Sequence, residues 1–182
     1  MDFMKIMQQR CSCRSFTDRP VAREDLMQII EAGRLTPSGC NAQPWKFIVV
    51  DEAEALQKVR DALVLENGKT GCPWRDQVQA FIILCEMPAK VMPAVVEYYG
   101  TTQRFAQGDL GAACMNMCHQ AMAMGLDTCI LGMHDREKLR GSFGLPEEAE
   151  ARLILAVGYG AQQGEMKKIR KSTEEICSFN QW

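Results

Sequence analysis

The sequence predicts a single α+β domain in which short buried strands lie among longer helices. The chain has 182 residues, 47% of them hydrophobic and 24% charged, which suits one hydrophobic core and is short for two. Apolar residues recur at helical spacing in several segments, whereas other stretches are short and continuously apolar. The predicted helices cover residues 2–9, 23–35, 51–65, 103–124 and 135–143, and the predicted strands cover 46–50, 80–86, 128–131 and 153–158.

The composition argues against several classes of protein. A formal net charge of −2 disfavours general affinity for nucleic acid or an anionic membrane, so any anion site has to be a local cluster of Arg and Lys. No apolar run reaches the about 18 residues of a membrane-spanning helix, and the N-terminus lacks the apolar core of a signal peptide. We therefore expect a cytoplasmic protein whose nine cysteines, an odd count, are mostly reduced thiols.

The first predicted helix, with Phe3, Ile6 and Met7 at helical spacing, leads directly into a basic segment. Arg10 and Arg14 supply planar guanidinium groups suited to a phosphate or a carbonyl edge, and Ser12 between them supplies a hydroxyl. Taken alone, the two arginines are more often solvated surface residues.

A polar loop follows the second predicted helix, which has an acidic first turn and ends before Pro37. Gly39 allows close approach of the backbone to a ligand, and side-chain amides and a hydroxyl offer hydrogen-bond donors and acceptors. Such a loop could read the edge of a flat heterocycle, although a polar turn before a strand is the commoner explanation. The residues concerned are Pro37, Ser38, Gly39, Asn41 and Gln43.

The segment 66–77 has Gly, Pro and no clear period, so it is predicted to be a loop. Trp74 within it is expected to anchor the core, and the alternative is that it stacks over a ligand ring. Residues 87–102 are ambiguous, and Tyr98 and Tyr99 are candidates for a pocket or an interface.

The predicted helix 103–124 is apolar on nearly all sides, which indicates burial on both faces and suits the central helix of a two-fold dimer. Gly125 is expected to end it. Cys114, Cys118 and His119 form the best candidate for a metal site, because residues four apart share a helix face. Two further ligands with suitable spacing are missing, so we expect no metal and interpret these cysteines as core residues.

The last part of the chain combines a strand that ends in Gly132, a helix with Asp135 as N-cap, and a basic tail at 167–171. The tail concentrates positive charge in a slightly acidic chain, although such runs are usually solvated. Ile176, Phe179 and Trp182 are apolar enough to pack on a partner subunit.

Two of these stretches resemble the nitroreductase family of small dimeric FMN-dependent oxidoreductases. The family pattern, Arg-x-Ser-x-Arg-x-Phe followed after a helix by Pro-Ser-x-x-Asn-x-Gln-Pro-Trp-x-Phe, occurs here in order at 10–16 and 37–47. The resemblance extends to 125–132, 153–160 and 167–171, so it covers most of the chain. It departs from the family at Cys11, where a second Arg is frequent.

The resemblance implies a three-layer α/β/α fold with a mixed, mainly antiparallel sheet, in an intertwined homodimer with FMN at the interface. The whole chain, 1–182, would be one FMN-binding domain, with 166–182 as an arm packing on the partner. Arg14 would stabilise the reduced flavin, and no side chain would be catalytic, because the cofactor carries the electrons. The implied cofactor-binding residues are Arg10, Cys11, Ser12, Arg14, Pro37, Ser38, Gly39, Asn41, Gln43, Cys129, Ile130, Leu131, Gly132, Lys168 and Arg170.

The implied reaction passes a hydride from NADH or NADPH through FMN to a nitroaromatic, quinone or similar acceptor by a ping-pong mechanism. A Gly-x-Gly-x-x-Gly fingerprint is missing, which fits a nicotinamide that visits the flavin pocket as a transient donor. Three alternatives stay open: reductive dehalogenation or flavin destruction within the same fold, a slow-turnover flavin-binding redox sensor, and a metal-binding redox module. The variable segment 66–102 would set the substrate.

Overall fold

The computed structural model describes residues 2–161 and 168–182. Its centre is a four-stranded antiparallel sheet in the order β1-β2-β4-β3, with β1 at Trp45–Val50, β2 at Ala80–Glu86, β3 at Asp127–Leu131 and β4 at Glu150–Gly158. All four predicted strands are confirmed, and β4 begins three residues earlier than predicted. A parallel bridge between Ser12 and Thr128 adds the N-terminal segment to the edge of β3 and makes the pairing mixed.

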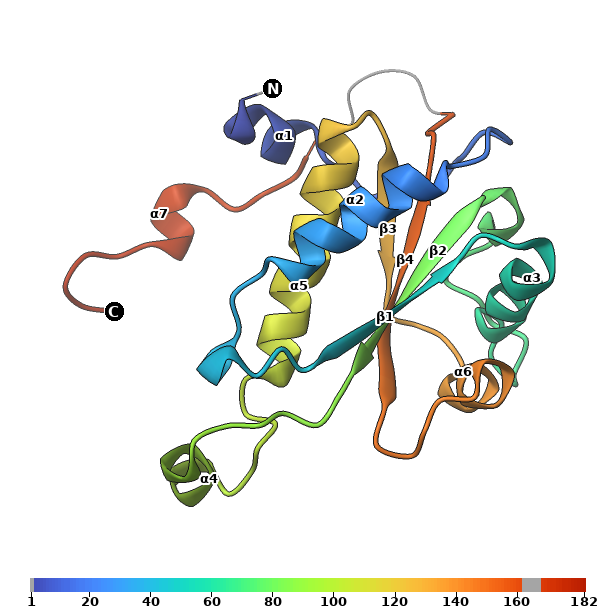
Figure 1. The fold of residues 1–182 in the computed structure, drawn as a ribbon. Helices are drawn as coiled ribbons and strands as arrows, with labels where there is room; N and C mark the ends of the chain where they lie inside the picture. The colour runs from blue at the N-terminus through green and yellow to red at the C-terminus, as the bar shows by residue number, and fades with distance from the viewer. Residues whose placement is uncertain (1, 162–167) are drawn as a thin grey trace.

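Helices cover both faces of this sheet, which gives the predicted three layers (Figure 1). The helices α2, at Arg23–Arg34, and α5, at Ala106–Ala123, pack on one face, and α3, at Ala53–Ala62, and α6, at Arg136–Phe143, pack on the other. Side chains of β2 alternate between the two cores, because successive residues of a strand point to opposite faces. Phe81 and Ile83 contact the α3 and α6 side, and Ile82 and Leu84 contact the α2 and α5 side.

The longest helix, α5, is buried along much of its length, as its apolar sequence predicts. Gly125, with a φ of 79°, follows its C-cap residue and ends the helix in the left-handed conformation that glycine adopts without strain. Asp135 caps α6 as predicted, since its side chain accepts a hydrogen bond from the backbone N–H of Lys138.

Besides a 3-10 turn in the loop before β1, three short elements were not predicted. The ambiguous stretch after β2 contains α4, at Pro93–Tyr99, which begins with a proline and ends at Gly100. The segment predicted as a loop contains one 3-10 turn, η2, at Arg75–Gln77. A four-residue helix, α7, at Thr173–Ile176, lies in the basic tail and starts with a capping box made by Ser172 and Glu175.

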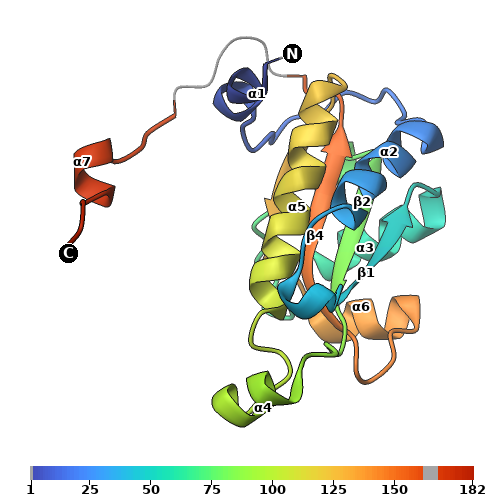
Figure 2. The ribbon, with the colours of Figure 1, turned by 60° about the vertical axis from the view of Figure 1, so that its left-hand side comes forward.

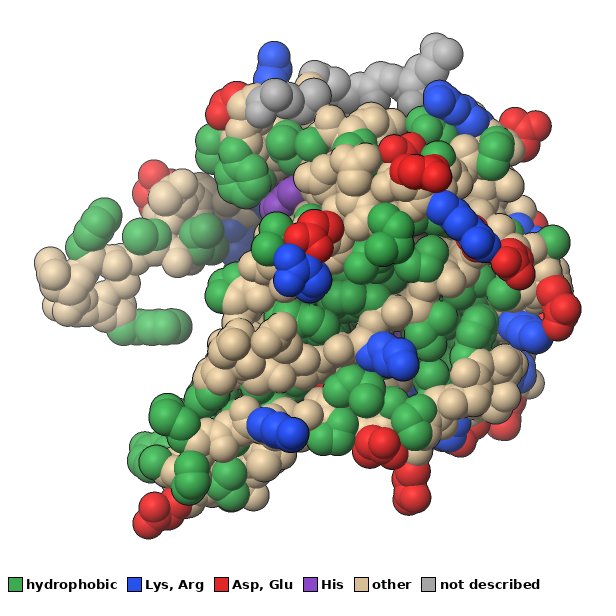
Figure 3. All heavy atoms as spheres, viewed as in Figure 1, with side chains coloured by type: hydrophobic (Ala, Val, Ile, Leu, Met, Phe, Trp, Pro, Cys, Tyr) green, Lys and Arg blue, Asp and Glu red, His purple; other side chains and the backbone are tan. Residues whose placement is uncertain are grey.

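The two ends of the chain lie apart from the sheet. The first helix, α1, at Phe3–Gln9, packs on α5. The segment that carries α7 extends away from the sheet and its helices in both views (Figures 1 and 2). Its apolar side chains stand free of the body of the chain (Figure 3), and Phe179 is 85% exposed. The first two residues of the predicted arm, 166 and 167, lie outside the described residues.

Candidate functional site

The arginine segment 10–14 lies beside β3, because it pairs with that strand as an extra edge. The backbone N–H of Cys13 donates to the Thr128 carbonyl at 2.9 Å, and Ser12 forms the parallel bridge to the same residue. The backbone N–H of Arg10 donates to the Ile6 carbonyl at the end of α1, and this bond fixes the backbone position from which the Arg10 side chain extends. The fold thus brings the arginine segment to the predicted segment 129–132.

Three basic side chains meet next to α1, and we call Arg10, Lys168 and Arg170 the cationic pocket. The Nη1 atom of Arg10 is buried and has no hydrogen-bond partner within the described residues. The Nζ atom of Lys168 donates to the Met7 carbonyl at 2.5 Å. Burial, and then the charges of Arg10 and Arg170, lower the pKa of Lys168. The positive charges of this cluster repel one another, and a bound anion would offset that repulsion. The cluster therefore has the chemistry of a phosphate site.

His119 lies in the same region, on the last turns of α5. Its Nδ1 atom is buried without a hydrogen-bond partner among the described residues, and the Phe3 ring of α1 packs edge-on at 5.4 Å between ring centroids. Burial, followed by the charges of Arg10 and Lys168, lowers the pKa of the imidazole. In the sequence, His119 stood out only as a candidate metal ligand, and its separation from Arg10 along the chain gave no sign of this neighbourhood.

Cys114 and Cys118 lie one helical turn apart on α5, as their spacing predicts. Both are buried thiols, and hydrogen bonding with Cys114 lowers the pKa of Cys118 to about 7. Within the described residues, no three His, Cys, Asp and Glu side chains are grouped so as to hold a metal ion.

A small cavity of about 170 Å³ opens beside the arginine segment. Arg14 and the predicted residues 129–132 line it, together with three residues that the site prediction did not include: Gly71, Trp74 and Met133. Trp74 is only 9% exposed and packs near Phe16, with 5.6 Å between ring centroids, so the predicted core anchor is also a wall of the cavity.

Cys129 contributes a thiol to this cavity without the features of a nucleophile. Burial raises its pKa, and the nearby charge of Arg14 and a hydrogen bond from Ser12 offset only part of that rise. A thiol that stays protonated near neutral pH is a weak nucleophile. The side chain therefore supplies an apolar surface rather than covalent chemistry.

The polar loop 37–43, which we call the amide loop, contains the 3-10 turn η1 at Gly39–Asn41. Its backbone is left-handed at three residues that are not glycine: Cys40, Asn41 and Gln43 have φ angles of 55°, 52° and 47°. The backbone N–H of Gln43 donates to Ser38 Oγ at 2.9 Å, within the loop. Such conformations persist only where surrounding contacts enforce them, and they concentrate at functional sites.

The amide loop is anchored to the start of α5. The backbone N–H of Gly39 donates to Asp109 Oδ2 at 3.0 Å. A Cβ atom on Gly39 would lie 2.6 Å from the Phe105 ring, so no larger residue fits there without a shift. Pro37, Asn41 and Gln43 are exposed, so the side-chain amides face away from their own core.

One protomer does not bring all the predicted site residues together. Asp109, which accepts the hydrogen bond from the amide loop, lies in the first turn of α5. Cys118 and His119, which lie near Arg10, belong to the last turns of the same helix. With 1.5 Å of rise per residue, Asp109 and Cys118 are about 14 Å apart along the axis. Figures 1 and 2 show the loop before β1 at one end of α5 and α1 at the other.

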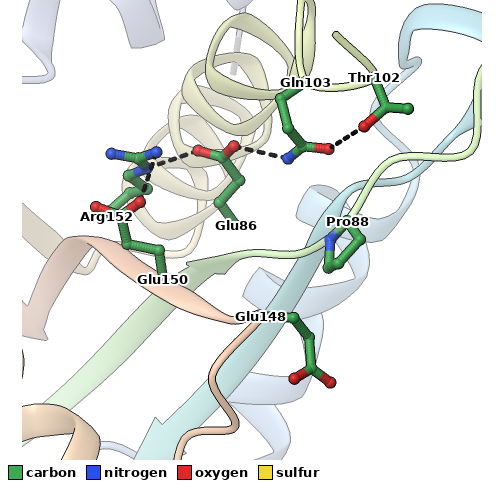
Figure 4. A pocket seen from close by; sticks show the side chains of 7 residues that line it. All are labelled: Glu86, Pro88, Thr102, Gln103, Glu148, Glu150 and Arg152. Carbon is green, nitrogen blue, oxygen red and sulfur yellow. Dashed lines mark hydrogen bonds and ion pairs between the residues drawn. The ribbon is translucent and has the colours of Figure 1, made fainter.

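A second cavity, of about 310 Å³, lies where β2 and β4 meet the start of α5 (Figure 4). Glu86, 5% exposed, accepts hydrogen bonds from Arg152 at 2.6 Å and from Gln103 Nε2 at 2.7 Å. The Gln103 side-chain oxygen accepts from the Ala89 N–H at 2.6 Å. Each of these side chains is paired within the network. We therefore interpret the network as a structural link that joins the two ends of the segment containing α4.

Comparison with known proteins identifies the family. Residues 7–159 match the model of the nitroreductase family. A protein of Archaeoglobus fulgidus, provisionally named as an NADH dehydrogenase or NAD(P)H nitroreductase, is 30% identical over 86% of this chain and 84% of its own length. An FMN reductase [NAD(P)H] of Bacillus subtilis is 30% identical over 96% of this chain and 72% of its own length.

The fold leads to the same conclusion. A crystal structure of a nitroreductase family protein from Clostridium difficile 630 matches with a TM-score of 0.84 and 26% identity, over the full length of both chains. These matches define the class of protein, namely α+β proteins with the nitroreductase fold. The chain belongs to the nitroreductase family. Among the described residues, no helix has the length and apolar character needed to span a membrane.

Proposed function

We propose that this protein is an FMN-dependent oxidoreductase that transfers a hydride from NAD(P)H through bound FMN to a small acceptor such as a nitroaromatic or a quinone, by a ping-pong mechanism. The observation that carries the proposal is the buried Nη1 atom of Arg10 in the cationic pocket, which has no hydrogen-bond partner in the described parts of the chain. A buried guanidinium nitrogen without an acceptor is costly, and a phosphate oxygen supplies the acceptor.

The residues present fit FMN at both ends of the proposed site. The cationic pocket would hold the phosphate group, with Lys168 already oriented by the Met7 carbonyl. The cavity beside β3 would take the edge of the ring, with Arg14 at its rim. Apolar walls such as Trp74 and Leu131 exclude water there, which strengthens electrostatic interactions inside the cavity.

FMN, when bound, supplies the chemistry of accepting and delivering a hydride. The residues of the chain bind and orient it. Arg14 places a permanent positive charge at the cavity, where it would favour an electron-rich ring system over a neutral one. Cys129 needs no catalytic role, in agreement with its raised pKa.

The site is completed, in this proposal, by a second copy of the chain. The amide loop leads into β1, whereas the cavity proposed for the ring lies beside β3, at the opposite edge of the sheet. Its side-chain amides are exposed at the surface, where another protomer would meet them. A homodimer would thus combine the cationic pocket of one protomer with the amide loop of its partner.

The C-terminal arm, residues 168–182, supports the same assembly. Ile169, Ile176, Phe179 and Trp182 are all more than two-thirds exposed in the single chain. Apolar side chains that gather on an extended arm indicate a surface that packs on another protein. We propose that the arm packs on the partner subunit.

Purification and kinetics test this function directly. The purified protein should be yellow or bind added FMN with a spectral change, and should oxidise NADH or NADPH over many turnovers when a quinone or nitroaromatic is supplied. Protein that binds no FMN would contradict the proposal at its base. A single reduction without turnover would indicate a redox sensor instead, and turnover only with a halogenated aromatic would indicate dehalogenation.

A further inference from the structure

The buried nitrogen of His119 is a feature that the proposed cofactor contacts do not use. Nδ1 of His119, on α5, and Nη1 of Arg10, after α1, are both buried and both without partners within the described residues. They belong to different elements, yet both lie against α1: the Phe3 ring contacts the imidazole, and the Arg10 backbone N–H donates to the Ile6 carbonyl. Lys168 Nζ donates to the Met7 carbonyl of the same helix. Two unpaired nitrogens from separate elements point to one missing acceptor between them.

The acceptor has to be anionic. Arg10 is permanently positive, and Lys168 and Arg170 add two more cations to the same region. No ion pair joins these three residues to a carboxylate within the described parts of the chain. A phosphate monoester offers three acceptor oxygens and nearly two negative charges, which suits several donors converging from different directions.

We propose that His119 is a further ligand of the FMN phosphate, donating a hydrogen bond from Nδ1, and that it takes up a proton when FMN binds. This inference rests on the proposed function, since it assigns a residue and a proton to the same site. The Phe3 ring packs on the imidazole at 79° between ring planes, which places His119 beside α1 and the cationic pocket.

The sign of the proton linkage follows from the neighbouring charges. Without a ligand, burial and then the charges of Arg10 and Lys168 hold the pKa of His119 below its usual value of 6.5, so the ring is neutral near pH 7. A dianionic phosphate reverses the local field and raises that pKa. When binding raises a pKa, the ligand binds most tightly below the free pKa, and the added affinity is lost as pH rises through the bound pKa.

Other titratable groups near the site have to be separated from His119. Burial and then the charges of Arg10 and Arg170 lower the pKa of Lys168, so any loss of its proton would weaken phosphate binding as pH rises, in His119→Gln as in wild type. Cys118, on the same helix, has a pKa of about 7 and also interacts with Arg10, so a thiolate there would weaken phosphate binding at alkaline pH. The phosphate itself has a second pKa of about 6, and its ionisation acts in the opposite direction to His119 by strengthening binding as pH rises.

The test compares FMN and riboflavin binding to the apoprotein as a function of pH. His119→Gln should weaken FMN binding about tenfold at pH 6 and progressively less towards pH 8.5, as a charged hydrogen bond is lost. Riboflavin, which lacks the phosphate, should bind His119→Gln and wild type equally. Cys118→Ser is the matched control on the same turn of the helix, and it should keep the difference between FMN and riboflavin.

Calorimetry in buffers of different ionisation enthalpy gives a second readout that does not depend on activity. Wild-type protein and Cys118→Ser should both take up a fraction of a proton per FMN at pH 7, and His119→Gln should not. No proton uptake by the wild type would overturn the proposal even if the variant failed to fold. Equal pH profiles for wild type and His119→Gln would also overturn it. Failure of the wild type to bind FMN at any pH would instead remove the proposed function.

Discussion

The cationic pocket and the amide loop lie at opposite ends of α5 and are built in different ways. The cationic pocket joins residues from the two ends of the chain, and the buried nitrogens in and beside it have no hydrogen-bond partner in ranges 2–161 and 168–182. The amide loop is local in sequence, its backbone is held by Ser38 and Asp109, and its side chains are exposed. The difference teaches that the cationic pocket turns its donors inward, as a ligand site requires, whereas the amide loop presents its side chains outward from a backbone held in place.

The largest expected effect comes from removing the buried guanidinium of the cationic pocket. Arg10→Ala should weaken FMN binding by about 30- to 100-fold, because a charge-assisted hydrogen bond to phosphate contributes roughly 2–3 kcal/mol. A flavin fluorescence titration measures this loss, and riboflavin should be affected far less. Arg34→Ala, which removes an exposed arginine paired with Glu31, is the control and should bind like wild type. Equal FMN affinity in Arg10→Ala would remove Arg10 from the pocket.

Mixing two inactive variants tests whether the two regions belong to one site across a dimer. Arg10→Ala and Asn41→Ala each impair every site of their own homodimer. A mixed dimer has one site with both changes and one with neither, so equal mixing should restore roughly a quarter of wild-type turnover. Steady-state NAD(P)H oxidation after subunit exchange measures the recovery. Exchanged dimers without any recovery would show that both residues serve the same protomer's site.

Enlarging Gly39 tests whether the amide loop depends on its rigid support. Gly39→Ala would drive a methyl group into the Phe105 ring, 2.6 Å away, and disturb the hydrogen bond to Asp109. We expect a loss of about 1–3 kcal/mol in unfolding free energy, as for other overpacked sites. Gly141→Ala on α6, where a Cβ would meet nothing within 4 Å, is the matched control. It should stabilise by about 0.5–1 kcal/mol, since alanine favours a helix. Chemical denaturation measures the unfolding free energy of both variants. An unchanged unfolding free energy in Gly39→Ala would show that the loop moves to accommodate the methyl group and is not rigidly held.

The smallest effect is expected at the exposed rim of the cationic pocket. Arg170 is exposed, so Arg170→Ala should weaken FMN binding only about threefold to tenfold, through an interaction that solvent screens. The loss should shrink as the salt concentration of the titration rises. Arg19, which is exposed and lies over the Tyr159 ring at 3.8 Å, supplies the control Arg19→Ala. An effect of Arg170→Ala as large as that of Arg10→Ala would contradict the distinction between buried and exposed cations.

Much of the fold could be predicted because it depends on local patterns. The strands β2 and β4 each contain a continuous apolar run, 80–85 and 153–157, and α5 is apolar on nearly all sides, so burial on both faces follows from the sequence. The helix α4 was not predicted because it has no buried residue and so no face that packs into the core. The segment that contains it is held to the sheet by the hydrogen bond from Gln103 to Glu86. A tertiary contact of that kind leaves no periodic signal in the sequence.

The candidate site was predictable only in part, for a similar reason. Residues of the arginine segment and of 129–132 carry recognisable motifs, and the bridge between Ser12 and Thr128 brings them together. Trp74 was predicted as a core anchor, with stacking over a substrate ring as the alternative, and the structure places it both in the core and in the lining of the cavity. The surroundings of His119 come from distant parts of the chain, and a lone histidine on an apolar helix has no spacing that would predict them.

The free arm at the C-terminus bears on how the protein behaves at different concentrations. Helix α7 has four residues and a capping box but no buried side chain, and a single turn of helix is not stable by itself in water. If the arm gains its order from a second copy, dilution should melt it before any other element. A protease that cuts after Phe or Trp would then remove the arm quickly at nanomolar protein and slowly at high concentration. The rate of this cleavage would therefore measure how much of the protein is assembled.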